Sequence, residues 1–172
     1  VVQEGAGYRL VTDPAERPGT IGKLREFWGN FSMFVRAWAL IREWGPEGAK
    51  ATAELAVLNA CYLRARLKDA FHLPYPTASL HEVVLDARLQ KASGVTTMDV
   101  AKRLIDHGFH PPTIYFPLVV QGALMIEPTE TESKETLDAF AEAMLAIAEE
   151  AKRDPGAVQA APTLPVRARL DE

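Results

Sequence analysis

PPTIYFPLVVQGALMIEP, residues 111–128, is the stretch that decides how this chain folds. It is rich in Ile, Val, Leu, Tyr and Phe, which favour β-structure, but Pro117 and Gly122 interrupt it. Because an internal proline cannot donate a hydrogen bond to a sheet ladder, we predict two strands, or one bent strand at a sheet edge. The chain is therefore expected to contain a small sheet.

An amphipathic helix is predicted directly after this stretch, over residues 132–153. Its apolar residues recur every three or four positions, and Pro155-Gly156 should end it. The side chains expected to be buried are Leu137, Phe140, Met144 and Ile147.

Carboxylates are concentrated where the apolar stretch gives way to this helix. Thr129 and Glu132 have the spacing of a capping box, and further acids in a first helical turn are favoured by the helix dipole. Helix initiation therefore explains Glu130, Glu132 and Glu135. Glu127 is different, because it ends a strand before a proline, beyond the reach of the dipole. A functional interpretation and a structural one both remain open for Glu127.

The preceding residues predict one further strand and three helices. The strand covers Leu80 to Leu89, and a helix with Thr97 as N-cap closes at His107-Gly108. Helical spacing of aromatic and aliphatic residues predicts two more helices, from Leu24 to the Gly45-Pro46 break and from Glu47 to Phe71. Buried positions of the latter should include Leu55, Leu58 and Tyr62.

This order of elements predicts an α/β chain of the two-layer α+β type, with a small sheet and helices packed mainly on one face. Residues 1–22, with their prolines and glycines, should form an extended N-terminal segment. We expect one small domain over residues 23–154 and an irregular tail over residues 155–172.

Composition narrows the possible function classes. The chain has 172 residues, of which 48% are hydrophobic and 24% are charged, with a formal net charge of -4. Its Lys and Arg residues are scattered, so neither nucleic acid nor a membrane surface is an expected partner. A single cysteine, Cys61, and the absence of a membrane-length apolar run favour a cytoplasmic protein. The chain opens with Val1 and not Met, so its true start is left open.

Known active-site motifs are not found. The sequence has no nucleophile elbow, phosphate-binding loop or dinucleotide fingerprint. No metal site is expected, because the metal-binding spacings of His and Cys are missing and His81-Glu82, at a strand start, should point to opposite faces. Gly29-Asn30, at the start of an aromatic helix, offers backbone N–H groups and an amide, or is a plain turn and cap.

Several stretches together resemble one family, the glycine decarboxylase or P-protein of the glycine cleavage system, in the C-terminal part of its subunit 2. They are ERPGTIGKLREFWGNF at 16–31, AVLNACYLRARL at 56–67, HEVVLD at 81–86, DVAKRLIDHGFHPPTIYFPLVVQGALMIEPTETESKETLDAF at 99–140 and PVRARLDE at 165–172. They cover most of the chain in order, and the block at 99–140 is highly specific.

The resemblance implies the small C-terminal domain of a fold-type I enzyme that uses pyridoxal 5'-phosphate. Such enzymes decarboxylate glycine and pass its aminomethyl group to the lipoyl arm of the H-protein. It also implies a homologous P-protein subunit 1 and an α2β2 hetero-oligomer. The cofactor lysine is expected upstream, since no lysine here lies in a glycine-rich His-Lys context, so the chain alone should be inactive.

Position in the matching motifs makes Asn30, His81, Glu127 and Thr129 the candidates to face cofactor or substrate. We also expect no arginine clamp on the substrate carboxylate from residues 111–127, because such a clamp would stabilise the charge that must leave as CO2. The alternative is a non-catalytic module in which the helices and the proline-rich tail only dock a partner.

Overall fold

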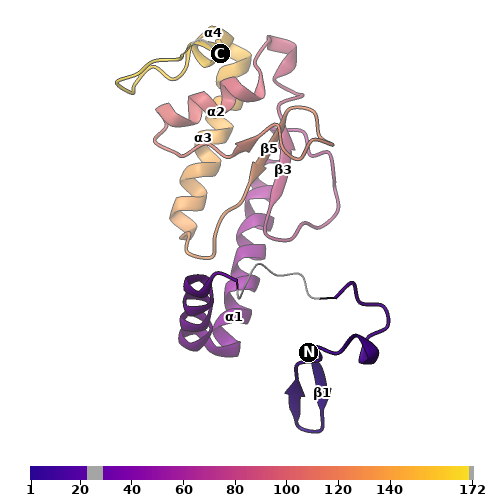
Figure 1. Cartoon of the computed structure of the whole chain (residues 1–172). Coiled ribbons are helices and arrows are strands. Elements are labelled where there is room, and N and C mark those ends of the chain that lie inside the picture. The colour runs from indigo at the N-terminus through magenta and orange to yellow at the C-terminus, as the bar shows by residue number, and fades with distance from the viewer. Residues whose placement is uncertain (23–28, 171–172) are drawn as a thin grey trace. The chain divides into compact units, whose positions relative to one another are not determined.

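A computed structural model of the chain describes residues 1–22 and 29–170 (Figure 1). It divides into two compact units, residues 1–45 and 46–172, which are described separately below. No helix among the described residues has the length and apolar character needed to cross a membrane.

The first unit opens with a small hairpin. Strands β1 (Val2–Glu4) and β2 (Gly7–Arg9) pair antiparallel around a turn in which Gly5 has φ of 61°. A 3-10 turn, η1 (Pro14–Glu16), follows. The predicted extended segment is therefore partly folded, because the glycines allow a tight turn, although nearly all its residues are exposed.

Helix α1 (Phe31–Leu67) is interrupted where the sequence predicted a break. Gly45 has φ of 62° and ψ of -173°, and Pro46 starts the second part. The helix predicted from Leu24 begins at Phe31 in the described chain, and residues 23–28 lie outside the described residues.

The second part of α1, in the larger unit, ends at Leu67 and not at Phe71. Its buried stripe is formed by Ala60, Leu63 and Leu67. The expectation for Leu55 and Leu58 was wrong, because these side chains lie off that stripe and are 45% and 62% exposed.

The larger unit contains a three-stranded antiparallel sheet in the order β3-β5-β4. The strands are β3 (Val83–Asp86), β4 (Thr113–Ile114) and β5 (Ala123–Ile126). The prediction of two strands in residues 111–128 is confirmed, with Pro117 in the connection between them. The strand predicted over residues 80–89 is shorter than expected, because pairing with β5 covers only Val83 to Asp86.

One face of this sheet is packed in the core. Val83 pairs with Ile126 and Leu85 with Leu124, and all four side chains are buried. On the opposite face, Val84 and Met125 are only half-buried. Residues of α1, α2, α3 and α4 join the buried face in one core cluster, which confirms the predicted α+β fold.

Helix α2 (Thr97–Asp106) begins one residue earlier than predicted. Its N-cap is Thr96, which forms a capping box with Asp99. Thr97 is the first helical residue, and its hydroxyl donates to the Gly122 carbonyl at 2.6 Å. The expected closure at His107-Gly108 is observed, with Gly108 at φ of 81°.

Helix α3 (Lys134–Arg153) is capped by Ser133, whose hydroxyl accepts from the Thr136 N–H at 3.2 Å. The predicted capping box of Thr129 and Glu132 was therefore wrong, because the helix begins later. Glu132 instead donates its backbone N–H to the Thr129 carbonyl at 3.3 Å. Of the three acids assigned to helix initiation, only Glu135 lies in the first turn.

The tail is also more ordered than predicted. Residues 155–160 form helix α4 (Pro155–Ala160), which begins with the proline because its missing N–H is not needed there. Beyond it, the side chain of Asp106 accepts hydrogen bonds from the backbone N–H groups of Thr163 and Leu164, at 2.8 and 2.9 Å. The C-terminal segment is therefore held against the end of α2.

Candidate functional site

Three of the four candidate residues lie in one cleft of the larger unit. The cleft, about 460 Å³ in volume, is bounded on one side by α1 and on the other by the loops before β3 and after β5. His81, Glu127 and Thr129 all contribute to it. Its lining residues are Ala49, Thr52, Ala53, Ala56, Val57, Leu80, His81, Glu127, Pro128, Thr129 and Glu130.

The His81 imidazole lies between two carboxylates. Its Nε2 is 3.5 Å from Glu82 Oε1 and 3.7 Å from Glu127 Oε1. The expectation that His81 and Glu82 point apart was wrong, because β3 begins only at Val83 and both residues precede it. Strand alternation does not apply to that loop.

One ligand atom from each of these three side chains lies within 4.8 Å of the others. That spacing is compatible with a cation, but His81 and Glu127 are more than half exposed and exposed acids commonly gather without one. The cluster therefore does not change the expectation that the chain has no metal site.

The corner between β5 and α3 is tied to α1 by a residue that sequence reasoning missed. The Asn59 side-chain amide donates to the Thr129 carbonyl at 2.8 Å. The Thr129 hydroxyl lies 2.7 Å from that of Thr131. The sequence held one signal that could have identified Asn59. It is a polar residue placed at helical spacing from Ala56, which lines the cleft, and from Leu63, which is buried.

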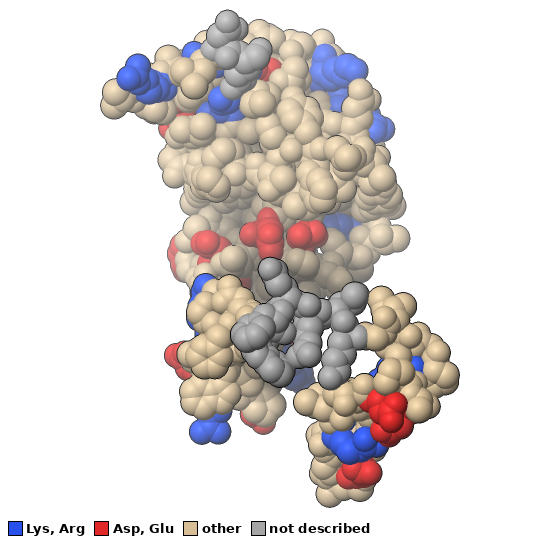
Figure 2. Space-filling model, viewed as in Figure 1, with Lys and Arg blue, Asp and Glu red and all other residues tan. Residues whose placement is uncertain are grey.

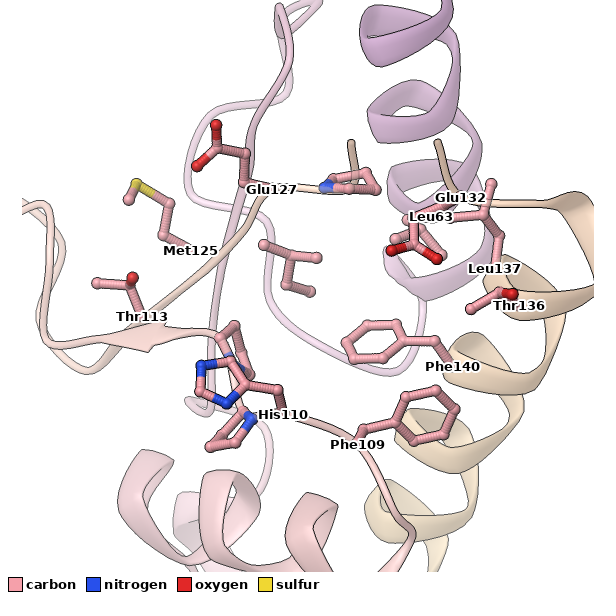
Figure 3. Close-up of a pocket in the computed structure, with 14 residues that line it drawn as sticks. Leu63, Phe109, His110, Thr113, Met125, Glu127, Glu132, Thr136, Leu137 and Phe140 are labelled. Carbon is pink, nitrogen blue, oxygen red and sulfur yellow. The ribbon is translucent and has the colours of Figure 1, made fainter. Parts of the chain in front are cut away.

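A second cleft of about 390 Å³ lies on the other side of this corner (Figure 3). Phe109 and Phe140 meet edge to face in it, with ring centroids 5.4 Å apart. Glu127 and Pro128 line both clefts. The Glu127 carboxylate points away from the two rings in Figure 3, so its charge belongs to the side of the corner where His81 lies.

The first cleft has a negative character. Glu127 and Glu130 are among its lining residues, while none of the described residues that line it is Lys or Arg. In the view of Figure 2, several acidic side chains of the larger unit lie close together below a broad uncharged surface. Such a cleft suits hydrogen-bond donors and cations, and its imidazole and carboxylates can hold or transfer a proton.

Asn30 is not brought to this cleft. It belongs to the first unit, where its carbonyl accepts from the Met33 N–H at 3.1 Å and its side chain accepts from the Ser32 hydroxyl at 2.6 Å. These contacts fit the cap interpretation of Asn30, and its role at a site stays a prediction.

Comparison with known families matches residues 52–164 to the family model described as "Glycine dehydrogenase, C-terminal domain". The matched range includes Asn59, His81, Glu127 and Thr129, and therefore the corner and all the residues that line the first cleft except Ala49.

Curated relatives are similar over nearly the whole chain. A probable glycine dehydrogenase (decarboxylating) subunit 2 of Halalkalibacterium halodurans is 56% identical over 172 residues, which are 100% of this chain and 35% of the relative. Proteins of the same description from Chlorobium phaeovibrioides and Chlorobaculum tepidum are 57% and 54% identical, over 98% and 96% of this chain and 34% of each relative. The chain thus spans about a third of the length of these relatives.

Proposed function

Because the chain belongs to the glycine dehydrogenase C-terminal domain family, we propose that it is the small domain of a glycine decarboxylase. The complete enzyme would decarboxylate glycine with pyridoxal 5'-phosphate and pass the aminomethyl group to the lipoyl arm of an H-protein. The identity of more than half of the residues across the whole chain carries this proposal.

The lysines that the structure describes do not fit the covalent attachment of that cofactor. A lysine that forms an imine needs a desolvated pocket. Among the described lysines, Lys102 is half-buried and the other five are exposed: Lys50, Lys68, Lys91, Lys134 and Lys152. We therefore place the cofactor lysine outside this chain and expect the chain alone to be inactive.

The chain's own contribution, in this proposal, is the cleft that contains His81, Glu127 and Thr129. His81 Nε2 lies 3.7 Å from Glu127 Oε1, which is an ion-pair distance and too long for a direct hydrogen bond, so both groups can face the same polar ligand. The Thr129 hydroxyl and the backbone of the corner can orient a polar ligand beside them. We propose that this face of the domain points to the cofactor side of the complete enzyme.

The expected lack of an arginine clamp stays part of the proposal. Residues 111–127 contain no arginine. Arg88 is the arginine nearest to β3 in the sequence, but it follows the end of that strand opposite to His81. Its Nη2 is 3.5 Å from the buried Asp86 carboxylate. Bound glycine with its carboxylate on Arg88 would overturn this part.

Spectroscopy tests the proposed function. The complete subunit, mixed with its homologous subunit 1, should show a cofactor absorbance band that glycine shifts, and the 172-residue chain should show none. Release of CO2 from glycine by the complete enzyme gives the matching activity. A complete subunit that neither binds the cofactor nor responds to glycine would contradict the proposal.

The other partners follow from the family alone. On that basis we also propose a partner subunit 1, a partner H-protein, an α2β2 assembly and a cytoplasmic location. A non-catalytic docking module is the alternative, and the exposed apolar residues of the first part of α1, such as Phe31 and Trp38, favour it. A gene that encodes no large cofactor domain upstream of Val1 would support the alternative.

A further inference from the structure

We propose that Asn59 is a positioning residue that holds the Glu127–Thr129 corner against α1 and thereby sets where the Glu127 carboxylate stands beside His81. This inference rests on the proposed function, because it concerns the same cleft. In this inference Asn59 acts on the site through its neighbours and does not itself contact the reacting atoms.

The corner has few bonds of its own. The β5 ladder ends at Ile126, α3 begins only at Lys134, and Pro128 has no N–H to donate. Within residues 127–132, the bond from Asn59 to the Thr129 carbonyl is the single hydrogen bond to a distant part of the described chain. This bond joins residues that are 70 positions apart in the sequence, so it holds the corner against a distant element, helix α1.

The position of Asn59 on α1 explains how this bond acts on the site. Ala56, one turn before it, lines the first cleft, and Leu63, one turn after it, lines the second. Pro128, which precedes the bonded Thr129, is buried, and Glu127 comes directly before it in the sequence. A shift of the corner away from α1 would therefore move Glu127 relative to His81 and change the partition between the two clefts.

The half-buried state of Asn59 supports the same conclusion. Its amide spans from a rigid helix to a carbonyl that also accepts the Glu132 N–H. Sites carried by regular elements hold their geometry better than sites on free loops. Here a loop carboxylate takes its position from a helix through one side-chain bond.

The experiment uses the complete enzyme with subunit 1 and compares Asn59→Ala with Asn59→Asp. The second keeps the size of the side chain but replaces the donor with a carboxylate that faces the Thr129 carbonyl. Both should lower kcat for glycine decarboxylation by about tenfold, with a smaller change in KM, because a small misplacement of an active group is costly. Glu54→Gln is the matched control on α1, since Glu54 is exposed and, among the described residues, its ion pair is with Lys50 at 3.7 Å.

A double-mutant cycle with Glu127→Gln separates positioning from general destabilisation. If Asn59 acts through Glu127, Asn59→Ala should cause little further loss of kcat when Glu127 is already replaced. Independent, multiplying losses would overturn the inference.

Hydrogen–deuterium exchange of residues 127–136 in the complete subunit gives a readout that does not depend on activity. Asn59→Ala should raise exchange there several-fold and Glu54→Gln should not. Unchanged exchange would overturn the inference even if the enzyme is active. A wild-type enzyme that does not decarboxylate glycine would contradict the proposed function, and exchange would still decide whether Asn59 holds the corner.

Discussion

At the scale of single residues, Glu127 differs from the acids that follow it because of its surroundings. Glu135 lies in the first turn of α3, where its own backbone N–H and the Ser133 hydroxyl lower the pKa of its carboxyl. Glu127 does not lie at the start of a helix, because it follows β5 and α3 begins only at Lys134. It lies beside His81, at a corner that is held by Asn59.

This difference leads to a prediction for the site. Alanine at His81, Glu127 or Thr129 in the complete enzyme should lower glycine decarboxylation by roughly 10²-fold or more where the side chain transfers a proton. Asn30→Ala tests the candidate that lies in the other unit. Steady-state rates measure the effect, and Glu142→Ala, at an exposed position of α3, is the control. Rates within about twofold of wild type for all four would reduce them to scaffold.

At the scale of elements, the turn into β5 depends on Gly122. Its φ is 70°, and a Cβ there would lie 3.0 Å from Thr97 Oγ1, the atom that donates to the Gly122 carbonyl. This contact joins the start of α2 to the central strand of the sheet. The glycine is therefore required both by backbone conformation and by space.

Gly122→Ala should destabilise the junction of α2 and β5 by about 1–2 kcal/mol, because left-handed backbone is costly for alanine. Native-state hydrogen exchange of these two elements measures the local effect. Gly156→Ala in α4 is the matched control. Its Cβ would have 3.5 Å to the nearest atom, and it should be neutral or stabilising by about 0.5–1 kcal/mol. Equal effects at the two glycines would contradict this explanation.

At the scale of the whole molecule, carboxylates on α2 tether the C-terminal segment. The Asp106 side chain is 2% exposed, and it also pairs with Arg103, which bridges to Glu150 on α3. Burial by itself would raise the pKa of Asp106, but the N–H groups of Leu164 and Thr163 and the Arg103 guanidinium outweigh it and lower the pKa. Arg169 reaches Asp99 at 2.5 Å, at the other end of the helix.

Asp106→Ala should release the tail and speed its cleavage by trypsin near neutral pH. Asp69→Ala, at an exposed position of the same unit, is the control.

Because the pKa of Asp106 is lowered in the folded chain, its tether to the tail stabilises above the ordinary aspartate pKa of about 3.9. It is lost as the pH falls through the lower folded value. The wild-type tail should therefore become sensitive to pepsin only in strong acid, and release at pH 5 would contradict the assignment.

Much of the fold could be predicted from local patterns. The apolar stretch interrupted by Pro117 predicted two strands, and the Gly45-Pro46 pair predicted the break in α1, because glycine and proline act on their own backbone. Cap positions were less certain. Thr96, not Thr97, caps α2 and Ser133, not Thr129, caps α3, since several hydroxyl residues with suitable spacing compete at each helix start.

The sequence by itself determined the α+β class, the order of the main helices and strands between α1 and α3, and the family, because these depend on periodicity and on long matching motifs. Only the tertiary structure decided that His81 lies beside Glu127 and that Asn59 holds Thr129. It also decided that Leu55 and Leu58 are exposed. These are contacts and burial between segments far apart in sequence, and they depend on which faces meet when the helices pack on the sheet.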